Sequence, residues 1–121
     1  MLYINKRGNF NENSDPRRWM KSYYIDIVIY HLKKNNIKYE LITKKTVLPE
    51  GAWVLLSRPF KGVKLPKHYN VIFCNIEPVY HKKILVMFRK EIKNIRCVLD
   101  YTLLNKPIWE NIGVKFIHFP F

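Results

Sequence analysis

Acidic side chains are scarce in this 121-residue sequence. Nine Asp and Glu stand against 22 Lys and Arg, so the formal net charge is +13. An excess of this size favours polyanionic partners, which include nucleic acid, an anionic membrane surface, nucleotide phosphates and acidic proteins. The abundance of Lys, Ile, Asn, Tyr and Phe is also what codon bias in an AT-rich genome produces. Both interpretations of the charge stay open at this point.

Cysteines and long apolar runs are also few. The two cysteines, Cys74 and Cys97, each lie within an apolar run and lack CxxC or Cys/His spacing, which argues against a zinc site and a disulfide scaffold. We expect reduced core thiols, although a disulfide is geometrically possible if the two strands are neighbours. No run approaches the roughly 18 apolar residues of a membrane span, and MLYINKRGNF has no apolar core of a signal peptide. We therefore expect a protein without a membrane span that is soluble or at most peripheral, and its location is expected to be cytoplasmic.

Motifs that would define an enzyme or a cofactor site are missing. GxGxxG, GxxxxGK[ST] and GxSxG are all absent, so no named phosphate loop or nucleophile elbow applies. No two of the four histidines have metal-ligand spacing, and His31 falls on an apolar helix stripe, where we expect it to pack in the core. We expect no metal and no cofactor. The histidines are His31, His68, His81 and His118.

The apolar patterning predicts a single α/β domain over residues 1–121. Hydrophobic residues make up 48% of the chain, and aromatic residues make up 15%. The order of elements is β-α-β-β-β-α-β-α-β, which predicts a Rossmann-like, mostly parallel sheet with helices on both faces. The predicted strands are 2–5, 38–43, 53–56, 71–76, 96–100 and 114–118, and the predicted helices are 16–35, 81–94 and 102–111.

Polar residues follow several of these strands, at the edge where parallel sheets bind ligands. Glu77 and Asp100 are the carboxylates that could orient a hydroxyl or act as a base, or else cap helices and pair with arginines. The loop after the first strand could hold an anion near a helix N-terminus, or be an ordinary loop. The candidate catalytic residues are Glu77 and Asp100, and the candidate ligand-binding residues are Asn75, Tyr101, Asn105, Arg7 and Gly8.

Cations gather on the predicted second helix. This stripe could neutralise nucleic-acid phosphates without sequence specificity, or be a solvated helix face. No helix-turn-helix, zinc-finger or RNP signature accompanies it. The predicted polyanion patch is Lys82, Lys83, Arg89, Lys90 and Lys93.

Two segments of the second half form a recognisable pattern, VIFCNIEPVY at 71–80 and VLDYTLLNKPIWENIGVKFIHFPF at 98–121. In these segments the chain resembles the N-terminal, acceptor-side domain of GT-B-type glycosyltransferases, as found in bacteria and large DNA viruses. An Asn-x-Glu turn ends one strand, and Asp-Tyr-Thr with a later Asn ends the next. The matching residues are Asn75, Glu77, Asp100, Tyr101, Thr102, Asn105, Gly113 and Pro120.

This resemblance implies a glycosyltransferase-like domain that binds an acceptor or a sugar-related ligand. Its partners would be a nucleotide sugar or glycan acceptor, and a second glycosyltransferase-type domain or partner chain, because a GT-B enzyme needs both halves. Here the sequence stops where the linker would begin, so we expect an enzyme that is incomplete alone. The location would be the host cytoplasm or a virion if the protein is viral. The alternative is a non-enzymatic basic protein that binds polyanions or nucleic acid, or forms part of a virion.

Overall fold

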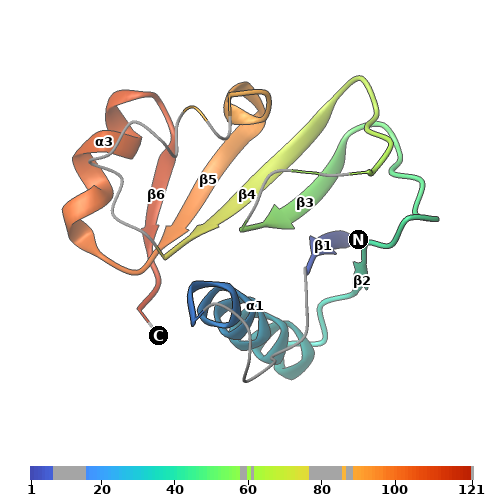
Figure 1. Ribbon diagram of the computed structural model, residues 1–121, viewed down its shortest axis with the longest axis horizontal. Helices are drawn as coiled ribbons and strands as arrows, with labels where there is room; N and C mark the ends of the chain where they lie inside the picture. Colours follow the sequence, from blue (N-terminus) through green and yellow to red (C-terminus); the bar gives the residue numbers. More distant parts are fainter. Residues whose placement is uncertain (7–15, 58–59, 61, 77–85, 87–88, 121) are drawn as a thin grey trace.

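The computed structural model describes residues 1–6, 16–57, 60, 62–76, 86 and 89–120, without the side chains of 16–23. Within this part, six strands form one sheet with helices packed against it (Figure 1). The strands are β1 (Leu2–Asn5), β2 (Tyr39–Leu41), β3 (Ala52–Leu56), β4 (Tyr69–Asn75), β5 (Ile95–Asp100) and β6 (Lys115–His118). The helices are α1 (Pro16–Lys34), α3 (Lys106–Asn111) and the 3-10 helices η1 (Ile92–Asn94) and η2 (Leu103–Asn105).

The sheet has the order β2-β1-β3-β4-β5-β6, and every neighbouring pair is parallel. The chain steps from β1 outward to β2, then crosses to the other side of β1 and adds β3 to β6 in sequence. The direction of winding therefore reverses between β1 and β3, which makes this pair the topological switch point of the sheet. The expectation of a single Rossmann-like α/β fold is confirmed.

Each face of the sheet has its own apolar core. On one face, Tyr24, Ile25 and Val28 of α1 cover Ile4 and Leu55. On the opposite face, Trp109 of α3 packs over Val54, Phe73 and Val98, among others. The alternation of side chains along each strand explains this division, because consecutive residues point to opposite faces. Helices therefore lie on both faces, as the element order predicts.

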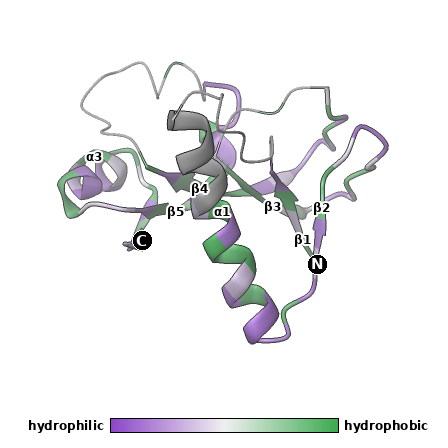
Figure 2. Ribbon diagram, turned by 60° about the horizontal axis from the view of Figure 1, so that its bottom comes forward, coloured by the Kyte–Doolittle hydropathy of each residue, from purple (hydrophilic) through white to green (hydrophobic). Residues whose placement is uncertain are grey.

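α1 ends where a residue adopts a left-handed backbone. Asn36 has a φ of 55°, and the Ile37 amide donates to the Leu32 carbonyl at 2.9 Å. Asn tolerates this conformation better than most residues. A left-handed residue at a helix end turns the following amides back toward the last helical carbonyls, which then accept hydrogen bonds. The part of α1 whose side chains are described alternates hydrophobic and hydrophilic residues along its length (Figure 2).

Three local predictions need correction. His31 is exposed rather than packed in the core, because the buried face of α1 is centred on Tyr24, Ile25 and Val28. The predicted helix over 81–94 does not continue to its end, since 89–91 form a turn and η1 follows with 3-10 bonding. The predicted helix over 102–111 is divided into η2 and α3, and Pro107 lies in the first turn of α3, where its missing N–H costs nothing.

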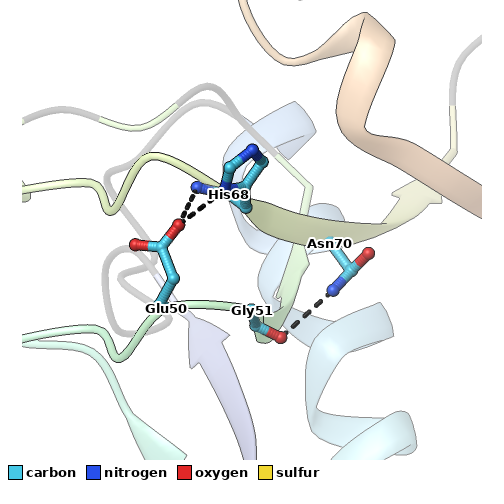
Figure 3. A network of polar contacts seen from close by, with 4 residues as sticks. All are labelled: Glu50, Gly51, His68 and Asn70. Carbon is cyan, nitrogen blue, oxygen red and sulfur yellow. Dashed lines mark hydrogen bonds and ion pairs between the residues drawn. The ribbon is translucent and has the colours of Figure 1, made fainter.

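A polar network joins the amino ends of β3 and β4 (Figure 3). The Glu50 carboxylate accepts hydrogen bonds from the His68 backbone amide at 2.6 Å and from its ring Nδ1 at 2.8 Å. The Asn70 amide donates to the Gly51 carbonyl at 3.1 Å, and the Gly51 amide donates to the His68 carbonyl at 2.8 Å. Gly51 has a φ of 77°, a conformation that favours glycine. These contacts fix how the two strands start.

This network predicts a pH-dependent contribution to stability. The hydrogen bond from the His68 side chain lowers the pKa of Glu50 below its ordinary value. A carboxyl group with a lowered folded-state pKa stabilises the fold above its unfolded pKa, and the contribution is lost as pH falls through the folded value. The stability gap between the natural protein and Glu50→Gln should therefore shrink as pH falls from about 6 to about 3 in urea unfolding. His68→Ala should reproduce most of the loss near neutral pH. A gap that is constant over this range would contradict the assignment.

Candidate functional site

The carboxyl ends of β4, β5 and β6 bring the predicted site residues to one edge of the sheet. Asn75, Asp100 and His118 are register partners across these three strands. Asn75 and Asp100 are almost fully buried, whereas His118 is exposed. Two residues after the end of β5 the chain enters η2, and this short helix brings Asn105 back to the Asp100 side chain. The sequence-predicted cluster at this edge is therefore partly assembled by the fold.

Asp100 is the centre of this cluster, and its side chain is 0% exposed. Its two carboxylate oxygens accept hydrogen bonds from four different residues. Asn75 Nδ2 donates at 2.9 Å and Trp109 Nε1 at 2.9 Å, both to Oδ2. Asn105 Nδ2 lies 3.1 Å from each oxygen, and the Thr102 backbone amide donates to Oδ1 at 3.1 Å. Every group in contact with these oxygens is an N–H donor, and an ionised carboxylate can only accept hydrogen bonds.

These contacts give Asp100 a structural role. They tie β5 to β4 through Asn75, to η2 through Asn105 and to α3 through Trp109. Hydrogen bonds to a charged group contribute about 1.5–3 kcal/mol each, more than neutral ones. To take a proton from a substrate, the carboxylate would need an accessible oxygen, and neither oxygen is exposed. The geometry supports the capping alternative for Asp100 over the general-base alternative.

The same edge is closed further by the chain that leaves β6. The Tyr24 hydroxyl of α1 donates to the Phe119 carbonyl at 2.5 Å, and the two rings meet edge to face at 5.4 Å. The Phe119 amide donates to the Asp100 carbonyl at 2.8 Å, and His118 Nε2 lies 3.2 Å from the Tyr101 carbonyl. Burial raises the pKa of the Tyr24 hydroxyl, so it acts here as a donor. The polar groups of β4 to β6 thus find partners within the chain.

Only some of the site residues predicted from the sequence lie together in the structure. It brings Asn75, Asp100, Tyr101 and Asn105 together. Glu77, Arg7, Gly8, Lys82 and Lys83 lie outside the described residues. Sequence reasoning missed Trp109, because a partner on the next helix leaves no local signature. It also missed Asn5, the last residue of β1, although the loop that follows was singled out.

Neither cysteine is positioned as a nucleophile. Both thiols are free; burial, reinforced by the neighbouring Cys97, raises the pKa of Cys74. Burial also raises the pKa of Cys97, with Lys115 opposing the shift. A raised thiol pKa keeps the group protonated and unreactive.

Within the described ranges, no group of three or more His, Cys, Asp or Glu could hold a metal ion, and no helix is long and apolar enough to cross a membrane.

Exposed cations are concentrated at the amino ends of β5 and β6. Arg89 and Lys90 lie in the turn before η1, Lys93 lies within η1, and Arg96 and Lys115 lie at the starts of the two strands; all five are exposed. Lys115 pairs in register with Cys97, the neighbour of Arg96. We call these five residues the amino-edge basic cluster. It includes the three described members of the predicted polyanion patch.

Comparison with known proteins assigns no family. No family model matches the sequence, and no match was found among curated proteins or among solved structures. The similarity to glycosyltransferase half domains therefore stays a prediction from the residues of the second half.

The structural role of Asp100 can be measured by substitution. Asp100→Asn keeps the shape but places an amide donor among the donors of Asn75, Asn105 and Trp109, so we expect a loss of at least about 2 kcal/mol in unfolding free energy. Glu110→Gln is the matched control, because Glu110 forms an exposed ion pair with Lys106 at 3.7 Å. The control should cost less than about 1 kcal/mol. Equal urea midpoints for the two variants would refute the structural role.

Proposed function

We propose that this protein binds the phosphate backbone of nucleic acid through the amino-edge basic cluster, without sequence specificity. The observation that carries the proposal is the separation of charges in the fold. Within the described residues, most acidic side chains are buried or paired, whereas most Lys and Arg side chains are exposed.

The acidic side chains illustrate this separation. Within the described part of the chain, Glu91 and Asp100 are buried. Asp26 pairs with Lys6, Glu50 with His68 and Glu110 with Lys106, which leaves Glu40 exposed without an ion pair. The exposed cations are far more numerous, and among them Lys106 is the one paired with Glu110: Lys33, Lys34, Lys38, Lys44, Lys45, Lys64, Lys67, Arg89, Lys90, Lys93, Arg96, Lys106 and Lys115.

The amino-edge basic cluster is the densest group of these cations in the sequence. Four of its members fall within eight residues, from Arg89 to Arg96, and the sheet brings Lys115 beside them. Arg96 is held in place, because its Nε donates to the Asn70 side-chain oxygen at 2.9 Å. Lys and Arg side chains that replace the counterions around phosphates give binding that weakens steeply with salt. An arginine held by a hydrogen bond beside exposed lysines suits such backbone contacts.

The test measures binding to double-stranded DNA of random sequence as a function of salt. The natural protein should show a steep, sequence-independent salt dependence. Replacing Arg89, Lys90 and Lys93 by Gln should lower the slope of log K against log salt by about 2 to 3, since each lost phosphate contact removes roughly 0.9.

The matched control replaces three cations elsewhere. Lys33, Lys34 and Lys38 lie at the end of α1 and before β2, and β1, β3 and β4 separate β2 from β5 in the sheet. Their replacement by Gln changes the net charge equally but should leave most of the slope intact. Absence of binding, or equal losses in the two triple variants, would refute a localised interface.

A glycosyltransferase-like role is the second candidate. It is supported by the parallel Rossmann-like sheet and by the way Asn75, Asp100 and Asn105, which carry the resemblance, form one bonded unit at its carboxyl edge. With Asp100 buried, the catalytic carboxylate of this candidate would be Glu77. Calorimetric titration with nucleotide sugars and acceptor sugars, alone and with a candidate second domain, should show binding. No binding under either condition would exclude this role.

A further inference from the structure

Two buried side-chain atoms in the described part of the chain have no hydrogen-bond partner, Asn5 Nδ2 and Glu91 Oε2, and the first contrasts with the satisfied edge of β4 to β6. Asn5 is the last residue of β1 and only 7% exposed, and its side-chain Nδ2 is buried without a hydrogen-bond partner. Asn75 and Asn105, which are also buried, both donate to Asp100. The fold thus satisfies its asparagines at β4 and η2 but leaves the donor at β1 without an acceptor.

Such a group destabilises the unliganded fold. A buried donor without an acceptor costs about 1–3 kcal/mol, and native proteins contain few of them. An apolar residue of similar size at position 5 would avoid this cost. A group that is costly in the free protein is explained if something outside the chain supplies the missing acceptor.

Asn5 lies at the switch point of the sheet. Its register partner on β3 is Leu56. After β1 the chain continues to α1, which covers the face that contains Ile4 and Leu55, whereas Phe60 and Val63, which follow β3, pack on the opposite face. The described segments that follow β1 and β3 thus diverge to opposite faces of the sheet. In open parallel sheets this divergence creates the crevice in which ligands bind.

The electrostatics at this position favour an anion. Because β1 and β2 are parallel, α1 must run back between them, so its N-terminus lies at the same edge as Asn5. The 19-residue helix presents a positive pole there, and its first turn holds no acidic residue. Lys6, the next residue along, forms an ion pair with Asp26 of α1 at 2.5 Å, which fastens the helix to the end of β1.

We propose that the β1/β3 switch point binds a phosphate group of a small molecule, with Asn5 Nδ2 donating a hydrogen bond to a phosphate oxygen. The ligand class is a nucleotide or another phosphorylated metabolite. The site lies at the carboxyl edge of the sheet, opposite the amino-edge basic cluster, and does not depend on nucleic-acid binding there. Since Nδ2 is shielded from solvent, the oxygen that it contacts is enclosed, and a single buried water is the competing occupant.

The experiment titrates the 121-residue chain with inorganic phosphate, adenosine diphosphate, uridine diphosphate and the neutral nucleoside adenosine. Calorimetry gives the affinity, and the NMR signal of the Asn5 side-chain amide reports contact. We expect the phosphorylated compounds to bind and to shift this signal, and adenosine to do neither. Inorganic phosphate separates recognition of the bare anion from recognition of a whole nucleotide.

Two variants and a matched control locate the site. Asn5→Ala should weaken binding about ten- to hundredfold, as expected for loss of one hydrogen bond to a charged acceptor. Asn5→Asp should abolish binding, because it replaces the donor with a negative charge. Asn70→Ala removes an asparagine side chain at the opposite edge and should leave phosphate affinity unchanged. The Gln variant of Arg89, Lys90 and Lys93 should also retain it, which separates this site from the nucleic-acid interface.

Stability provides a second readout. Without ligand, Asn5→Ala should be at least as stable as the natural protein, because it removes an unsatisfied donor, whereas an asparagine needed only for structure would lose stability on substitution. Failure of every phosphorylated compound to bind would overturn the proposal and leave a buried water as the partner of Asn5. Unchanged affinity in Asn5→Ala, or affinity lost only in the basic-cluster variant, would also overturn it.

Discussion

The buried carboxylate of Asp100 is the interaction on which the β4–β6 half of the protein depends. Moving a carboxylate out of water is expensive, and the cost is offset only if several donors converge on it. Here those donors come from β4, η2 and α3, in addition to the Thr102 amide. The position of each of these elements is therefore constrained by one charge. The Trp109 ring also packs against Phe73 at 5.6 Å, which couples the polar network to the apolar core.

Satisfied and unsatisfied polar groups are therefore distributed unevenly over the sheet. At the carboxyl ends of β4 and β5, the side chains of Asn75 and Asn105 both donate to Asp100 and hold the fold together. At β1 the Asn5 donor is left unused beside the switch point. At the amino edge, the five cations of the basic cluster are exposed, whereas Glu91, the carboxylate within their stretch of sequence, is buried. Ligand binding is thus best sought where the fold has not satisfied its own groups.

Most of the fold could be predicted from the sequence, because apolar runs and helical periodicity are local signals. All six strands and α1 lie within a few residues of their predicted ranges. The site was harder to predict. Asp100 and Asn105 could be recognised as neighbours at a strand end, but the sequence left open whether Asp100 acts as a base or a cap. That choice depends on Trp109, nine residues further on, and on Asn75 from another strand.

The sequence by itself determined the fold class, the positive charge and the residues that reach the carboxyl edge, since these follow from composition and from patterns within a few residues. Only the tertiary structure decided which side chains are buried and which have hydrogen-bond partners within the chain. Burial and hydrogen-bond partnership arise between segments far apart in the chain, so Asp100 became fully engaged, His31 became exposed and Asn5 kept an unpaired donor. The structure thereby moved the search for a ligand from the predicted carboxylates to the switch point and the basic cluster.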